Sequence, residues 1–419
     1  MSINLERERE MADPPKTILV IGGGLGGLAF AQIVRHSEVG YKYKVMIYER
    51  DASATHREQG YQLGINQAGL ACLSSIPHIA TVLDTMPHDK VNAAIMLDHK
   101  LNIMLEFRQM PWSDGLAGVV NRRKLRQALS EGLDVKWGKK FVRYEETESE
   151  VIAYFEDGTH AVGDLLIGAD GAKSKVRAQR CPDLQLEQIP ILDTRASVAL
   201  TPAVKSKLPR LVQLTDNAYI VRVLAPNGTS VLVMNYAAQV ENGEPRLIWA
   251  ISFPSAMVPN FPTDPAEVKT EVDSMANKLL CNELATLISE TRIEDYLFPA
   301  PRFLQAIVPV NGNPLATTSR VTLLGDAAHA MTNHRGLGAN TAFADAADLA
   351  HVLVQQDDND PWLGLAHYQE VMIKRGFNAV KMSRQSTTTM HLTGMRSVLR
   401  NVLLRAIGWI LWGKQIVWG

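Results

Sequence analysis

The chain has 419 residues, enough for two or three domains with large cores. With 43 Lys and Arg against 44 Asp and Glu, the formal net charge is −1, so a nucleic-acid partner is not expected. Cys72, Cys181 and Cys281 form no zinc-binding or disulfide spacing, and the charged first ten residues do not form a secretory signal. These features predict reduced thiols, no metal site and a cytoplasmic location.

The first predicted unit is a strand, a glycine-rich turn, a helix and a second strand. Residues 17–21, TILVI, form a continuous apolar run typical of a buried parallel strand. The turn GGGLGG follows at 22–27, then an Ala-rich stretch with helical spacing at 28–35, and then an apolar run at 43–48 that ends at Glu49. This order predicts a dinucleotide-binding unit.

Four residues of this unit have predicted roles. Gly22 would permit the tight turn, Gly24 would let the backbone approach a pyrophosphate, and Gly27 would let the helix pack close to the strand. The N-terminus of the helix would face the phosphates. Glu49 would accept hydrogen bonds from both ribose hydroxyls of an adenosine, which disfavours a 2′-phosphate at that site.

Further along the chain, β-like runs predominate. Residues 92–107 show two such runs around a turn, and residues 119–129 are typical of a strand that leads into a helix. The stretch 186–301 is mostly β with one predicted helix at 265–288. It predicts a second domain built on a sheet.

Two later segments are DLLIGADGAKSKVR at 164–177 and RVTLLGDAAHAMTNHRGLGANTAFADAADLA at 320–350. Together with GGGLGG and Arg122, they resemble the four sequence marks of the flavoprotein monooxygenases of the para-hydroxybenzoate hydroxylase type. The marks occur in the family's order and spacing over most of residues 16–355. Four marks in register are more specific than any one of them.

The resemblance implies an α/β fold with a Rossmann-like, GR2-type FAD-binding domain, an inserted mostly β substrate domain and a C-terminal helical tail. The FAD-binding domain would comprise residues 16–185 and 302–395, with a hairpin near 92–107 joining the substrate domain. The substrate domain would comprise residues 186–301, and the tail residues 396–419. FAD would be the bound cofactor. NAD(P)H would be a transient co-substrate, because no second glycine motif is present.

The resemblance also implies contacts to FAD. Asp326, at the end of VTLLGD, would bind a ribityl hydroxyl of the flavin chain. Arg122 would contact flavin-chain oxygens or the pyrophosphate, or else lie on a solvated helix face. Asp170 would take part in FAD and nicotinamide nucleotide binding, or else belong to a structural turn that Ser174 caps.

Two more segments would reach the cofactor. Gly60 and Gln62 lie in a loop that would pass the adenosine and ribityl portions, with Gln62 in contact through its backbone. Gly338, Ala339 and Asn340 open a predicted helix. The positive end of its dipole would stabilise the anionic reduced flavin.

The loop after Asp326 departs from the family pattern. Thr332 and Asn333 stand where proline is usual, and Arg335 stands where glycine is frequent. His334 would then reach the catalytic face as a base or a substrate ligand, or would only bond the loop backbone.

Polar and aromatic side chains on the predicted strands of the second domain are candidates to line the substrate site. A phenol-like substrate needs a cation or a hydroxyl that favours its phenolate, and aromatic walls that exclude water. By position in the resembled family, Arg195 and Tyr236 are the leading pair. The full set of candidates is Arg195, Arg222, Asn235, Tyr236 and Trp249.

The implied reaction uses NAD(P)H and O2 to insert one oxygen atom, by hydroxylation or epoxidation, into an electron-rich aromatic or polyketide- or alkaloid-like molecule through a flavin C4a-hydroperoxide. A flavin oxidase or reductase on the same fold is the main alternative. A non-catalytic escort or dissociation inhibitor is the other, and intact Glu49, Arg122 and Asp326 argue against it.

The tail leaves two interpretations open. Residues 397–419 mix tryptophans and aliphatic side chains with Arg400, Arg405 and Lys414, and no stretch approaches the ~20 apolar residues that span a bilayer. The tail would lie on a membrane surface, or pack on its own domain or on a second subunit. The oligomeric state, monomer or homodimer, stays open as well.

Overall fold

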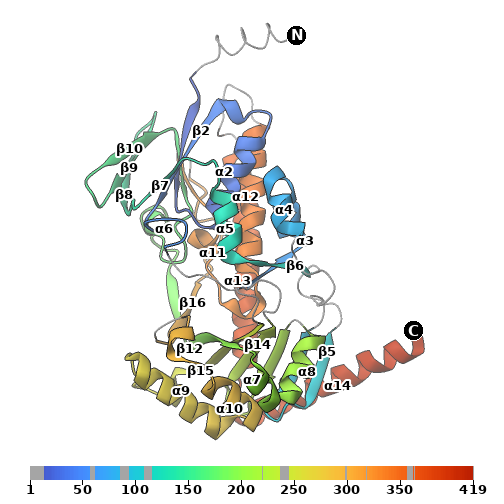
Figure 1. The fold of residues 1–419 in the computed structure, drawn as a ribbon. Helices are drawn as coiled ribbons and strands as arrows, with labels where there is room; N and C mark the ends of the chain where they lie inside the picture. Colours follow the sequence, from blue (N-terminus) through green and yellow to red (C-terminus); the bar gives the residue numbers. More distant parts are fainter. Residues whose placement is uncertain are drawn as a thin grey trace.

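The structure is a computed structural model. It describes residues 14–56, 62–84, 94–107, 116–218, 220–235, 245–297, 300–317, 319–355, 362 and 364–418. One body is built on a five-stranded sheet and the other on a seven-stranded sheet, and the long helix α13 (Leu365–Met390) runs between them (Figure 1).

The five-stranded sheet is parallel, and its strands β1, β11 and β17 are buried on both faces. Its strand order is β17-β11-β1-β2-β7. The TILVI run lies in β1 and is almost fully buried, as an uninterrupted apolar strand requires. Helices α2 (Leu25–His36) and α12 (Gly338–Val354) pack against each other beside this sheet. The strands are β1 (Lys16–Ile21), β2 (Tyr43–Glu49), β7 (Val135–Trp137), β11 (Leu165–Gly168) and β17 (Val321–Leu323).

Smaller elements complete this body. A three-stranded antiparallel sheet has the order β10-β9-β8, and a two-stranded sheet pairs β3 with β6. Their bounds are β3 (Gln62–Asn66), β6 (Leu116–Asn121), β8 (Phe141–Glu146), β9 (Val151–Phe155) and β10 (His160–Gly163). The accompanying helices are α3 (Gln67–Ser74), α4 (Ala80–Asp84), α5 (Arg122–Ser130), α6 (Lys175–Arg180) and α11 (Asp326–His329).

The seven-stranded sheet has the order β16-β12-β15-β14-β13-β4-β5, and only the β13–β4 pair is parallel. The predicted hairpin near 92–107 supplies β4 and β5. Strand β16 follows position 301, where the substrate domain was predicted to end, and still pairs with β12. The strands are β4 (Ala94–Asp98), β5 (Ile103–Phe107), β12 (Leu186–Ala199), β13 (Ile220–Leu224), β14 (Ser230–Asn235), β15 (Arg246–Pro254) and β16 (Arg302–Ile307).

The two faces of the seven-stranded sheet differ in character because side chains alternate along each strand. Val221 and Val223 point into an apolar core shared with four helices, whereas Arg222 points to the other face. Trp249 also lies in that core, where its Nε1 donates to Thr291 Oγ1 at 2.9 Å. The helices are α7 (Pro202–Lys207), α8 (Pro209–Asn217), α9 (Pro265–Leu279) and α10 (Asn282–Ser289).

The helix content of this domain exceeds the prediction. The single helix expected at 265–288 is wrong, because α9 ends before Leu280 and α10 begins after Cys281. The N–H of Cys281 donates instead to the carbonyl of His99, in the β4–β5 turn. The prediction also missed α7 and α8, each of which starts with a proline at its first position.

The tail forms one helix, α14 (Gly394–Trp418), which packs beside β5. The structure confirms the predicted α/β class: a parallel-sheet domain, a mostly β second domain and a helical tail. Within the described ranges, no helix is both long enough and apolar enough to cross a membrane.

Candidate flavin and substrate site

A cavity of about 430 Å³ lies where the two bodies meet. Its lining combines the glycine turn and Arg122 from the parallel-sheet body with Arg195 and Arg222 from the seven-stranded sheet. The loop from Met331 to Ala339 closes one side. One space therefore gathers most of the predicted cofactor and substrate residues.

The glycine turn has the geometry that its sequence predicts. Gly22 has φ +116°, and a Cβ there would lie 2.3 Å from the carbonyl oxygen of Ala169. A Cβ on Gly27 would lie 2.4 Å from the carbonyl oxygen of Gly22, so the helix packs directly on the turn. Gly24 caps α2 without a side-chain hydrogen bond and borders the cavity. The free N–H groups of this helix end can therefore receive an anion.

Glu49 lies behind the glycine turn, at the end of β2. Its Oε2 accepts from the N–H of Gly23 at 2.7 Å, and its Oε1 accepts from the N–H of Asp51 at 2.8 Å. Each oxygen keeps acceptor capacity for a ribose hydroxyl. The ribose contact stays a prediction.

Arg126 braces this region, and the sequence interpretation missed it. Its Nε donates to the carbonyl of Gly23 at 2.9 Å, and its guanidinium forms ion pairs with Asp51 at 3.2 Å and Glu49 at 3.7 Å. The side chain is buried. Its position one helical turn after Arg122, on the same face of α5, is the signal that could have found it.

Asp326 exposes its side chain to the cavity. Its position inside the cavity reduces its solvation and so raises its pKa, although the nearby cationic His329 and Arg122 oppose the shift. A Cβ on Gly338 would lie 3.6 Å from Asp326 Oδ1, so the carboxylate sits beside the N-terminus of α12. Asp326 and Arg122 thus face the same part of the cavity.

A buried ion network holds the turn that presents Asp326. Asp345 Oδ2 accepts from the N–H of Gly325 at 3.0 Å and lies 2.6 Å from His329 Nε2. Arg375 donates to Asp345 Oδ1 at 2.8 Å. Burial lowers the pKa of His329, but Asp345 outweighs that effect and the net pKa is raised. The sequence interpretation did not identify this network.

The N-terminus of α12 borders the cavity through Gly338, Ala339 and Asn340. No side chain caps it at Leu337. The side chain of Asn340 is used structurally, because its Oδ1 accepts from the N–H of Asn66 and its Nδ2 donates to the carbonyl of Gly64, both at 2.9 Å. The backbone N–H groups of this helix end therefore face the cavity, while the Asn340 side chain joins α12 to β3.

Three other predicted cofactor residues have different surroundings. Gln62 lines the cavity, and its side-chain oxygen is buried without a partner among the described residues. Asp170 does not line the cavity. Its Oδ2 accepts from the N–H of Lys175 at 2.8 Å, while Ser174 caps the same helix, α6, which favours the structural alternative. Gly60 lies outside the described residues.

His334 lines the substrate side of the cavity and has both ring nitrogens bonded. Its Nδ1 lies 2.8 Å from Thr387 Oγ1, and its Nε2 lies 3.3 Å from Ser252 Oγ. Ser252 Oγ also lies 2.9 Å from Nε2 of His391, whose Nδ1 lies 2.7 Å from the carbonyl of Thr387. Burial, and then Arg222, His391 and Arg195, lower the pKa of His334 well below its usual value.

These contacts locate the ring proton of His391. A carbonyl only accepts, so Nδ1 of His391 carries the proton and its Nε2 accepts from Ser252. The Thr387 hydroxyl beside Nδ1 of His334 also donates to the carbonyl of Ser383 at 3.0 Å and lies 2.7 Å from Thr332 Oγ1. With its lowered pKa, His334 is neutral near pH 7, and both of its ring nitrogens contact hydroxyl groups of the protein.

Two arginines give the substrate side a positive charge. Arg195 Nε pairs with Asp193 Oδ2 at 2.9 Å. Arg222 is only 8% exposed and has one hydrogen bond among the described residues, a long 3.5 Å contact to Ser230 Oγ. Burial lowers its pKa to about 10. Asp193 thus forms an ion pair with half-buried Arg195 and also acts on buried Arg222 from a greater distance.

The other candidate liners lie elsewhere. Trp249 belongs to the apolar core on the opposite face, and Asn235 Nδ2 donates to Asp216 at 3.2 Å rather than lining the cavity. Tyr236 lies outside the described residues.

The family described as "FAD binding domain" matches residues 16–250 and 309–370, well over half of the chain. The chain belongs to this FAD binding domain family. The predicted family and cofactor, FAD, are thereby confirmed, and the enzyme is a flavin-dependent oxidoreductase of the monooxygenase type.

Curated relatives of this FAD binding domain protein include fungal monooxygenases. The chain is 27% identical to the FAD-dependent monooxygenase thnD of Trichoderma harzianum, over 88% of this chain and 92% of the relative. It is 26% identical to the FAD-dependent monooxygenase phnB of Penicillium herquei, over 91% of this chain and 92% of the relative.

Solved structures share the fold. A putative FAD-containing monooxygenase from Photorhabdus luminescens superposes with a TM-score of 0.75 at 24% identity, covering 90% of this chain and 98% of that one. Klebsiella pneumoniae HpxO, complexed with FAD and uric acid, superposes with a TM-score of 0.76 at 21% identity, covering 93% of each chain.

The residues present fit FAD. The N-termini of α2 and α12, which no side chain caps, face the same cavity. Gln62 on β3 lines it as well, and its side-chain oxygen has no hydrogen-bond partner among the described residues. Arg122 and Asp326 would supply a cation and a carboxylate for the pyrophosphate and the ribityl hydroxyls. We therefore expect the cofactor to bind in this cavity.

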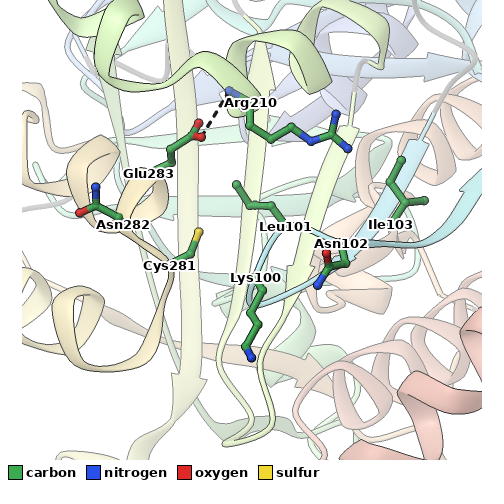
Figure 2. A pocket seen from close by; sticks show the side chains of 8 residues that line it. All are labelled: Lys100, Leu101, Asn102, Ile103, Arg210, Cys281, Asn282 and Glu283. Carbon is green, nitrogen blue, oxygen red and sulfur yellow. Dashed lines mark hydrogen bonds between the residues drawn. The ribbon is translucent and has the colours of Figure 1, made fainter.

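A second cavity, of about 520 Å³, lies at the β4–β5 turn and the start of α10 (Figure 2). None of the FAD marks lines it. Glu283, one of its charged residues, accepts from the N–H groups of Arg210 at 3.3 Å and Leu211 at 2.9 Å, so it caps α8. Burial raises the pKa of Cys281, so its thiol stays protonated. This cavity has no feature of a flavin site.

Proposed function

We propose that the enzyme uses NAD(P)H and O2 to insert one oxygen atom into an electron-rich, acidic small molecule such as a phenol or an enol. The net reaction is RH + NAD(P)H + H⁺ + O2 → ROH + NAD(P)⁺ + H2O. The observation that carries the proposal is the single cavity, which joins the FAD residues to the cationic side of the substrate sheet.

FAD, reduced by the nicotinamide nucleotide, supplies the activation of O2. The protein would orient it through Arg122 and Asp326 and would stabilise negative charge at the flavin with the N-terminus of α12. The apolar wall from Ile95, Ile248 and Leu232 would exclude water from the reacting centre.

Arg222 supports an acidic substrate. A buried guanidinium without a close ion pair among the described residues is unfavourable in an apolar setting, and an anionic ligand group would relieve that cost. A phenol or enol that ionises beside Arg222 also becomes more electron-rich, which is what oxygen insertion requires. Uric acid, the ligand in the HpxO structure, is an acidic, electron-rich ring of this kind.

The test is oxygen-isotope incorporation by the purified holoenzyme. Phenolic and enolic aromatic compounds would be supplied with ¹⁸O2 and either NADPH or NADH, and the products analysed by mass spectrometry. We expect a product that carries one ¹⁸O atom, formed with consumption of one equivalent of the nicotinamide nucleotide. Matching methyl ethers, which cannot ionise, should react far more slowly.

The same measurement separates the alternative function. A flavin oxidase or reductase would oxidise the compound or the nicotinamide nucleotide and release hydrogen peroxide, with no ¹⁸O in the product. That result across phenols and enols would contradict the proposed function.

A further inference from the structure

Helix α14 turns an apolar face to solvent. Side chains at the spacing of one helical face are exposed from Met395 to Ile410, with Trp409 76% exposed and Leu399 70% exposed. In Figure 1 the helix extends past β5, away from both sheets. The most exposed members are Met395, Leu399, Val402, Leu403, Trp409 and Ile410.

The opposite face of α14 is fixed to the protein. Arg400 is buried and donates to the carbonyl of Met390 at 2.7 Å, and Arg405 pairs with Asp98 at 2.7 Å. A Cβ on Gly408 would lie 2.6 Å from the carbonyl oxygen of Met104, so the helix lies directly on β5. The polar side of this amphipathic helix is therefore bound to the substrate domain. Its apolar side is presented outward over several turns.

The charge of this part of the chain indicates which partner would bind the exposed apolar face of α14. Helix α14 contains no Asp or Glu, and of its basic residues Arg400 is buried and Arg405 pairs with Asp98. On α14 itself, Arg396 is exposed beside the apolar stripe, and Lys414 follows in the sequence. Pairing the exposed faces of two copies of α14 would give Arg396 no acidic partner from the other helix. An anionic lipid surface complements that charge and accepts the apolar stripe.

We propose that α14 docks the enzyme on an anionic membrane surface, with the Met395–Ile410 stripe in the boundary between headgroups and acyl chains. The helix would lie along the surface because its other face stays on β5. Aliphatic side chains and Trp409 would supply apolar burial, and Arg396 would supply attraction to anionic headgroups. This inference does not depend on the identity of the substrate.

The experiment is co-sedimentation of the full-length holoenzyme with phosphatidylcholine vesicles, with or without phosphatidylserine. We expect binding that is stronger on the anionic vesicles. The triple variant Leu399→Ser, Leu403→Ser, Trp409→Ser should bind at least roughly tenfold more weakly. Arg396→Gln should lose roughly fivefold on anionic vesicles only.

A matched control carries three serine substitutions at exposed apolar residues elsewhere, Tyr41, Val142 and Ile293, and should bind like the wild type. Bound FAD in each variant, measured from its visible absorbance, verifies folding. A wild-type enzyme that stays in the supernatant with both vesicles would overturn the proposal. If it also elutes as a dimer that the α14 triple variant dissociates, the occupant is a second copy instead.

Discussion

The two sides of the central cavity shift the pKa values of their buried histidines in opposite directions. On the cofactor side, His329 pairs with Asp345, and its pKa is raised even though burial alone would lower it. On the substrate side, His334 and His391 contact hydroxyls and a carbonyl, and burial lowers both pKa values, that of His391 to about 4.

The difference shows where the protein balances its own charge. Around Asp326, the carboxylates and cations of the cofactor side compensate one another within the fold. Around Arg222, two guanidinium groups and two neutral histidines share one carboxylate, Asp193. The charges of the cofactor side compensate one another before FAD binds, so this side needs only to position the cofactor. The substrate side gains charge compensation when an anionic ligand binds.

The largest effect should come from the cofactor side. Asp326→Ala removes the carboxylate that we expect to bind the ribityl chain, and a charge-assisted hydrogen bond of this kind corresponds to roughly 100-fold in affinity. FAD retention after gel filtration, followed by titration of the apoprotein with FAD, measures it. Glu49→Gln should lose less, because one side-chain oxygen acceptor remains. Equal FAD affinity in Asp326→Ala and the wild type would remove this assignment.

On the substrate side, Arg222→Met should lower kcat/KM for the best phenolic substrate by roughly 30-fold while FAD stays bound. Removing an unbalanced buried charge should not destabilise the fold. Arg210→Met, in the second cavity, is the control and should leave kcat/KM unchanged. Unaltered kinetics in Arg222→Met would show that the substrate side does not bind an anion.

The brace around His334 should affect oxygen transfer rather than cofactor binding. His334→Ala opens space beside the flavin loop, and a small displacement of the substrate should slow oxygen transfer roughly tenfold and release hydrogen peroxide instead. Peroxide formed per NAD(P)H consumed reports this, with the exposed His351→Ala as control. If His334→Ala releases no more peroxide per NAD(P)H than the wild type but melts at a lower temperature, His334 has only a structural role.

The smallest effect concerns acid stability. The pKa of His391 in the folded chain, about 4, lies below its ordinary value of 6.5. Between these two pH values the unfolded chain binds a proton at His391 and the folded chain does not. The free energy of unfolding should therefore fall as the pH drops from about 6.5 towards 4, by about 1 kcal/mol over the first unit. Urea titrations of His391→Gln should show a shallower fall. An unchanged slope would mean that other groups dominate this range.

Sequence reasoning reached the features that are local in the chain. The strand, glycine turn and helix of residues 16–36 follow from one apolar run and three glycines, and the structure has that geometry. Asp326 and the α12 N-terminus were likewise found from a contiguous motif that resembles a known family.

The missed features depend on contacts between distant segments. Ser252 and His391 are 139 positions apart, and Arg126 and Gly23 are 103 apart. The break between α9 and α10 follows from a backbone bond to His99, which no helical periodicity could reveal. Local patterns specify elements and turns, whereas the charge balance of the cavity arises only when the two sheets meet.

The central claim is that the substrate side, through Arg222, favours an anionic ligand. The most direct test of this claim is the pKa of a bound phenol. A phenolic ligand whose phenolate absorbs away from the flavin bands would be titrated with pH, free and bound to the holoenzyme, in the wild type and in Arg222→Met. The charge of Arg222 should lower the pKa of the bound phenol by a unit or more, and the variant should lose most of that shift. A bound phenol that ionises at the same pH as the free compound in the wild type would contradict the account.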